Sequence, residues 1–129
     1  MTDYYTNFCF GIKVSKAQAE WLNGELKRRY DLDPEEPNWL SCEYQFSEEK
    51  DEVTFTDADG QTNVDAMIKL MGDFQRKFKL KTFISFGWAF TASRARIGAY
   101  GGGAVVLRYG IPSYMNTYEW IQKKTRSRT

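Results

Sequence analysis

The chain has 129 residues, the size of a single domain, and 42% of them are apolar, enough to form a packed core. It contains no histidine and two cysteines, which excludes Ser-His-Asp and Cys-His catalysis and zinc sites built from histidine or four thiolates. No stretch is apolar enough for a membrane span, and no signal peptide is evident. We therefore expect one cytoplasmic domain over residues 1–129 that is not an enzyme and needs no cofactor or metal.

The first part of the chain predicts a strand and then a helix. Apolar residues alternate with polar or small ones from Tyr5 to Val14, which is typical of a strand with one buried face. Ser15 with Gln18 three residues later fits a capping box, so a helix is expected to follow. The segment 31–38 contains two prolines and is predicted to be a loop.

A pair of strands and a second helix are expected next. Residues 40–46 and 53–56 alternate in the same way, and the charged segment 48–52 between them predicts a hairpin turn. Asn63 is a suitable helix cap. Apolar residues then recur at helical spacing from Val64 to Phe78, which makes this the clearest helix in the sequence.

The C-terminal part predicts two more strands and a last helix. The strands are expected over residues 82–91 and 104–109, joined by a segment rich in Gly and Arg. Asn116 and Glu119 fit a second capping box, and a basic tail begins at about residue 123. The order β-α-β-β-α-β-β-α predicts an α+β fold with an antiparallel sheet and helices on one face. We interpret it as a ferredoxin-like core with an added strand and a C-terminal helix.

The net charge of +1 conceals a strong separation of charge along the chain. Residues 31–65 carry 12 acidic side chains and one basic one, whereas the rest carries five acidic and 17 basic ones. Such charges can pair with one another across the fold, or a cluster of one sign can bind a partner. Four acids crowd the predicted turn: Glu48, Glu49, Asp51 and Glu52. We predict that this acidic hairpin binds the basic surface of a protein partner.

The segment from Arg94 to Gly103 is a candidate anion-binding or partner-binding loop. Arg94 and Arg96 offer forked donors, the glycines allow close approach to the backbone, and Tyr100 can stack on a ring. No phosphate-binding glycine motif is present. The alternative is a hairpin loop whose glycines serve turns and strand entry. Cys9 and Cys42 are interpreted as structural, because nothing near them in sequence suggests a reactive thiol.

Five motifs spread over most of the chain carry a family resemblance. They are Tyr5-Thr-Asn-Phe-Cys-Phe10, Phe74-Gln-Arg-Lys-Phe78, Phe86-Gly-Trp88, Gly101-Gly-Gly-Ala104 and Met115-Asn-Thr-Tyr-Glu-Trp120. In these the chain resembles a family of small uncharacterised proteins carried by bacterial plasmids, integrated elements and phages. The resemblance implies an accessory gene of a mobile element and no particular activity. By analogy, such genes often encode small binders that block host defences, including CRISPR and restriction systems.

Two functions from different classes follow. The first is a non-enzymatic interaction protein of phage or mobile-element origin, an inhibitor of a bacterial defence system such as CRISPR that binds a protein complex. The alternative is a nucleic-acid-binding accessory protein that uses the basic segments and stacking aromatic side chains. No RNP, KH or helix-turn-helix pattern supports the alternative. An enzyme is a third hypothesis, for which the sequence offers neither paired carboxylates at a recognisable spacing nor an activated nucleophile.

Overall fold

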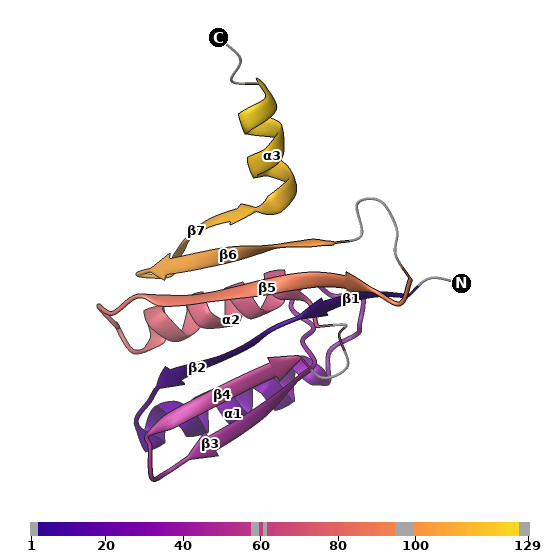
Figure 1. Ribbon diagram of the computed structural model, residues 1–129. Coiled ribbons are helices and arrows are strands. Elements are labelled where there is room, and N and C mark those ends of the chain that lie inside the picture. The colour runs from indigo at the N-terminus through magenta and orange to yellow at the C-terminus, as the bar shows by residue number, and fades with distance from the viewer. Residues whose placement is uncertain (1–2, 58–59, 61, 95–99, 127–129) are drawn as a thin grey trace.

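The computed structural model describes residues 3–57, 60, 62–94 and 100–126, and it has an α+β fold (Figure 1). Three helices and two antiparallel sheets make up the described part of the chain. In chain order the elements are β1 (Tyr4–Asn7), β2 (Cys9–Lys13), α1 (Lys16–Tyr30), β3 (Cys42–Ser47), β4 (Glu52–Asp57), α2 (Val64–Lys77), β5 (Ile84–Ala92), β6 (Gly101–Arg108), β7 (Ile111–Asn116) and α3 (Thr117–Arg126).

The chain passes from one sheet to the other between β1 and β2. One sheet has the strand order β1-β5-β6-β7 and the other has the order β2-β4-β3. Helices α1 and α2 lie behind them on one face, whereas α3 extends away from the end of β7 (Figure 1). The opposite face carries no helix in this view (Figure 1). No helix within the described ranges is long and apolar enough to cross a membrane.

The prediction of one strand from Tyr5 to Val14 was wrong, because the structure divides it at Phe8. The ring of Phe8 is buried against Phe10 and Phe86, with ring centroids 5.8 and 6.1 Å away. The Phe8 N–H donates to a carboxylate oxygen of Asp57 at 3.0 Å, and the Asp57 N–H donates to the Phe8 carbonyl at 3.1 Å. The chain therefore changes partner here, from β5 to β4, and one expected sheet becomes two.

Strand β7 was not predicted, and together with the division at Phe8 this leaves the expected order two strands short of the structure. Tyr109 and Gly110 both have positive φ, 52° and 81°, and form a two-residue turn that sends the chain back along β6. Gln75 of α2, which is buried, fixes this turn: its amide donates to the carbonyl of Leu107 at 2.9 Å and accepts from the Gly110 N–H at 2.8 Å. The strand is hard to predict from the sequence because it contains Pro112, and a proline argues against a strand.

The core lies between the two helices and the sheets. Helix α2 buries its predicted apolar face, and α1 buries Ala19, Leu22 and Leu26. Polar groups also join the helices: Arg29, only 3% exposed, bonds to Asp73 of α2 at 2.8 Å and to Glu25 at 3.3 Å. Leu107 is the last buried side chain in the described chain, so all of β7 and α3 lie outside this core.

Candidate functional site

The acidic turn, defined as Glu48, Glu49, Asp51 and Glu52, lies between β3 and β4 at one end of the molecule, at the lower left of Figure 1. The first three of these side chains are exposed, and no ion pair involves them within the described residues. Glu52 differs, because it is half-buried and its carboxylate lies 3.8 Å from the Lys13 ammonium. The structure thus brings the four predicted residues together, and three of the carboxylates have no ion-pair partner among the described residues.

Backbone contacts hold this turn in one shape. Strands β3 and β4 are paired up to Ser47 and Glu52, and the Ser47 hydroxyl accepts the Lys50 N–H at 3.3 Å. The Lys13 ammonium donates to the Lys50 carbonyl at 2.9 Å, and the Val14 N–H donates to the Asp51 carbonyl at 2.9 Å. Asp51 adopts a left-handed conformation with φ of 50°, which Asp tolerates better than most residues do. The acidic turn is therefore presented on a fixed scaffold.

Only part of the candidate loop near Arg94 lies within the described residues. Arg94 follows β5 and is exposed, whereas Arg96 lies outside the described residues. Tyr100 is 52% exposed, and its carbonyl accepts a hydrogen bond from the Tyr118 hydroxyl at 2.6 Å. Gly101, Gly102 and Gly103 belong to β6 and pair with Phe90, Ala89 and Trp88 of β5. These glycines therefore form part of the sheet, which agrees with strand entry as their role.

The basic segments that suggested nucleic-acid binding are partly used inside the fold. Arg28 bonds to Glu25 at 2.6 Å, and Arg29 joins Glu25 to Asp73. Arg76 bonds to Asp73 and donates to the Gly110 carbonyl at 3.0 Å. Arg76, which the nucleic-acid hypothesis would use, is thus engaged with a neighbouring side chain and a backbone carbonyl, and Arg28 and Arg29 are paired as well. Among the described residues, only the Lys13–Glu52 ion pair joins the acidic segment 31–65 to the rest of the chain, so the ion pairs give little support to pairing of those opposite charges across the fold.

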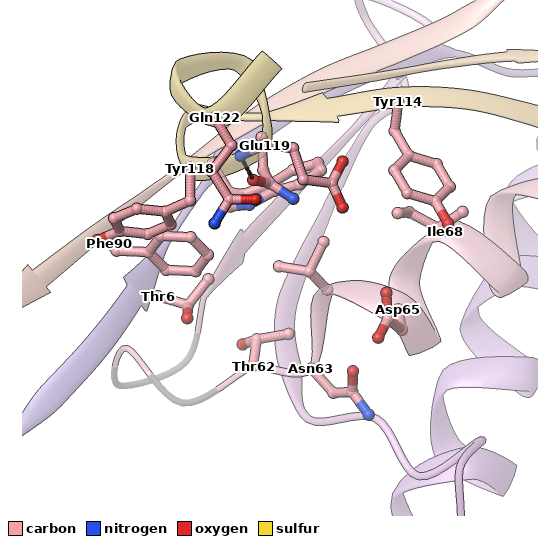
Figure 2. Close-up of a pocket in the computed structure, with 13 residues that line it drawn as sticks. Thr6, Thr62, Asn63, Asp65, Ile68, Phe90, Tyr114, Tyr118, Glu119 and Gln122 are labelled. Atoms are coloured by element: carbon pink, nitrogen blue, oxygen red, sulfur yellow. Dashed lines mark hydrogen bonds between the residues drawn. The ribbon is translucent and has the colours of Figure 1, made fainter. Parts of the chain in front are cut away.

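A cavity of about 690 Å³ lies at the opposite end of the molecule from the acidic turn, on the face of the sheet that carries α2. Its floor is formed by Thr6 of β1 and by Trp88 and Phe90 of β5. One wall is the start of α2, with Asn63, Asp65 and Ile68. The other wall is C-terminal and comprises Tyr114, Tyr118, Glu119 and Gln122 (Figure 2).

The glycines of β6 are required for the floor of this cavity. A Cβ atom on Gly103 would lie 2.4 Å from a ring carbon of Trp88, and one on Gly102 would lie 2.3 Å from the Trp88 carbonyl oxygen. Only glycine lets the indole lie against β6, since contacts this short do not occur for real Cβ atoms. Trp88 is half-buried as a result and leaves part of its surface on the cavity.

Helix α3 is attached to the same glycines. The Thr117 hydroxyl accepts the Gly102 N–H and donates to the Gly102 carbonyl, both at 2.9 Å. The Asn116 side chain accepts the Glu119 N–H at 2.8 Å, as expected for a cap. Two motifs that carry the family resemblance, Gly101–Ala104 and Met115–Trp120, therefore meet and build one side of the cavity. Their spacing in sequence did not reveal that they meet.

The cavity residues were not predicted as a site. Asn63 and Asn116 were recognised as helix caps, but nothing in the sequence shows that the two helix starts face the same space. Tyr114 could not be placed because β7 was not predicted. Eight aromatic residues of the described chain are exposed: Tyr4, Tyr30, Phe83, Tyr100, Tyr109, Tyr114, Tyr118 and Trp120. Five of the eight follow β5, so most of the exposed aromatic side chains belong to the C-terminal part of the chain.

The two thiols of the described chain lie in different environments. Burial, and to a lesser extent the charge of Glu43, raises the pKa of the Cys42 thiol to about 12, so this thiol is protonated at neutral pH. Cys9 is exposed, and its sulfur lies 3.6 Å from the Thr56 hydroxyl. Within the described ranges, no three Cys, Asp or Glu side chains gather in a way that would hold a metal ion.

No family model, curated protein or solved structure matches the chain.

Proposed function

We propose that the chain is a non-enzymatic interaction protein that binds a basic surface of a protein complex through the acidic turn. The observation that carries this proposal is the exposure of Glu48, Glu49 and Asp51 without an ion-pair partner among the described residues. Like charges held side by side repel one another and contribute nothing to folding. A basic partner surface would relieve that repulsion and would also speed the encounter of the two proteins.

The rigidity of the turn supports this role. A flexible acidic loop would lose conformational freedom on binding, and that loss would weaken the complex. Here the hairpin ladder and the bonds from Lys13, Ser47 and Val14 already hold the backbone in place. The side chains of Glu48 and Glu49 are then the main groups that a partner must order.

The resemblance to proteins of mobile elements suggests which partner to test. An accessory protein from a phage or plasmid would act in the bacterial cytoplasm, and host defence complexes carry basic surfaces where they hold nucleic acid. We propose that the acidic turn occupies such a surface on a defence complex, such as a CRISPR effector. In this mechanism the chain inhibits by covering the surface and needs no catalytic group.

We also infer that the first part of the chain is a ferredoxin-like core. If β1 and β2 are taken as one interrupted strand, the order across both sheets is β5, β1–β2, β4, β3. The pairings between these strands are all antiparallel, and α1 and α2 connect strands in the way the split βαβ pattern requires. Strands β6 and β7 and helix α3 are then additions to that core.

Nucleic-acid binding is the alternative, and α3 is the feature that favours it. Lys123, Lys124 and Arg126 follow one another along this exposed helix, and the Lys124 ammonium lies 5.8 Å from the centroid of the Trp120 ring. Exposed cations beside an aromatic ring can hold a phosphate backbone and stack on a base. Against this alternative, Arg76, one of the cations that it would use, is already paired with Asp73 within the fold.

The test is a pull-down with the tagged chain from a lysate that contains a candidate defence complex, with and without nuclease. We expect a stoichiometric protein partner that survives nuclease treatment. The double variant Glu48→Lys with Glu49→Lys should lose this partner and keep the melting temperature of the parent, because both side chains are exposed.

The matched control is Glu35→Lys with Glu36→Lys. This pair is also adjacent and exposed, and its reversal changes the net charge equally at another place in the fold. Equal loss of the partner in both variants would show that total charge matters and the acidic turn does not. Recovery that collapses with nuclease and weakens steeply with salt would favour the nucleic-acid alternative.

A further inference from the structure

The charged side chains on the walls of the cavity between α2, α3 and the sheet are acidic. Asp65 and Glu119 are both exposed, and both side chains reach toward the same opening, with the ring of Tyr114 beside them (Figure 2). None of the described residues that line the cavity is Lys or Arg. Lys123 and Arg126, farther along α3, line a separate groove with Glu119 and Gln122. The cavity therefore favours a positively charged occupant.

An anion fits this cavity less well, although two helices begin at it. The N-terminus of a helix attracts anions through its free N–H groups. Here the Asn63 side chain accepts the Ala66 N–H at 3.3 Å, and the Asn116 side chain accepts the Glu119 N–H at 2.8 Å. Asp65 and Glu119 stand in the first turns of the two helices, where an anion would have to approach. These carboxylates would repel it.

The rest of the lining suits an organic cation with an apolar stem better than a metal ion. Aromatic side chains form much of the surface, with Trp88 on the floor, Tyr114 near the carboxylates, and Phe90 and Tyr118 at the other end (Figure 2). Aromatic faces attract cations, and a planar guanidinium both stacks on such faces and binds a carboxylate through two N–H groups. The amide of Gln122 adds an uncharged hydrogen-bonding group to the opening.

We propose that this cavity binds a guanidinium group, with Asp65 and Glu119 pairing with the charge and Tyr114 stacking on the guanidinium plane. Two kinds of ligand carry a guanidinium group: the arginine side chain of a protein and a small free guanidinium compound. The cavity lies away from the acidic turn, so this proposal does not depend on the function proposed for that turn.

The experiment is an NMR titration of the full chain with N-acetyl-arginine N-methylamide, observing the side-chain amides of Asn63, Asn116 and Gln122. The control probe is N-acetyl-citrulline N-methylamide, which has nearly the same shape and no charge. We expect saturable shifts with the arginine probe only, with a dissociation constant on the order of 1 mM, as for a small ligand held by a few exposed contacts. Propylguanidinium is the third probe; it carries the same single charge as the arginine probe and represents a free guanidinium compound.

The variant Asp65→Asn with Glu119→Gln removes both charges and keeps the size of both side chains. It should weaken binding of the arginine probe about tenfold, because two exposed charge contacts together contribute roughly that factor. The variant Glu48→Lys with Glu49→Lys should bind the probe as the parent does, so a failure of the acidic turn would not be mistaken for a failure of the cavity. Each single variant, Asp65→Asn or Glu119→Gln, provides a second test if the double variant folds poorly.

Three results would overturn the proposal. They are equal binding of the citrulline probe, saturable shifts of the same amides with inorganic phosphate, and no saturable shift at about fifty times the expected dissociation constant. Tighter binding of propylguanidinium than of the capped arginine would identify a free guanidinium compound as the ligand. Binding of the capped arginine at least as tightly as propylguanidinium would identify a protein side chain.

Discussion

The core and the C-terminal segment of this chain are held by different interactions. Between Phe8 and Leu107, 17 apolar side chains are buried, and they join both sheets to α1 and α2. From Arg108 to Arg126 no described side chain is buried. There the structure depends on the β6–β7 ladder, on Gln75 at the turn, and on Thr117 at the start of α3. Burial of apolar side chains thus stabilises the core, whereas hydrogen bonds hold the C-terminal wall of the cavity in place.

The floor of the cavity and its C-terminal wall therefore differ in stability. A ten-residue helix is marginal in water unless other parts of the protein stabilise it. Segments with few buried contacts are also the first to open locally. The floor of the cavity, with Trp88 and Phe90, belongs to the stable part, and the wall formed by α3 belongs to the less stable part. Ligand binding should therefore order α3 more than any other element.

The largest expected effect comes from a pair of substitutions on either side of one turn. Leu107 is fully buried and Ile111 is 69% exposed, although only the Tyr109–Gly110 turn and Arg108 separate them. Leu107→Ala should lower the free energy of unfolding by about 2–5 kcal/mol, because it leaves a cavity in the core. Ile111→Ala should change it by less than about 0.5 kcal/mol.

Urea denaturation of both variants measures the two effects. Similar losses would mean that β7 packs against the core or against a second copy, and the comparison between core and C-terminal segment would then be wrong. A dependence of the Ile111→Ala midpoint on protein concentration would distinguish the second copy from the core.

A smaller effect is expected at the ion pairs that join α1 to α2. Partial burial acts to raise the pKa of Asp73, but hydrogen bonds and charges from Arg29 and Arg76 outweigh it and hold this pKa below its usual value. Because the unfolded carboxyl has the higher pKa, the stabilisation is complete above about pH 4 and is lost as the pH falls through the folded pKa. Asp73→Asn should cost about 1–3 kcal/mol at pH 7.

Stability curves between pH 7 and pH 3 test this assignment. The Asp73→Asn variant should lose less stability on acidification than the parent, since it has no proton to take up at this site. The control is Glu35→Gln, which changes an exposed carboxylate and should follow the parent. An unchanged acid dependence in the Asp73 variant would assign the loss of stability to other carboxylates.

Local patterns predicted the elements that depend on neighbouring residues. The Ser15 capping box is present, with Ser15 accepting the Gln18 N–H at 3.2 Å and Gln18 accepting the Ser15 N–H at 2.8 Å. The Asn63 cap and the buried face of α2 are present as well. Such features are fixed within four residues of sequence, so that spacing alone reveals them.

The missed features depend on residues far apart in the chain. Alternation continues through Phe8, and the break there requires Asp57 of another strand. The turn before β7 requires the Gln75 amide of α2, and Pro112 argues against a strand when read alone. The cavity requires Gly103 beside Trp88 and the starts of two helices at one place. Local patterns in the sequence carry no information about contacts between residues that are so far apart in the chain.

The smallest effect separates the position of α3 from the stability of the whole fold. Thr117→Val keeps the shape of the side chain and removes both hydrogen bonds to Gly102. Thr125→Val, in the same helix, removes one bond to the Gln122 carbonyl and serves as the control. Because no α3 side chain is buried, Thr117→Val should lower the free energy of global unfolding by less than about 1 kcal/mol. Hydrogen exchange should show α3 amides losing protection while those of α1 and α2 keep it. Equal loss of protection across all three helices would show that α3 is part of the cooperative core, because only then would weakening its attachment weaken everything else.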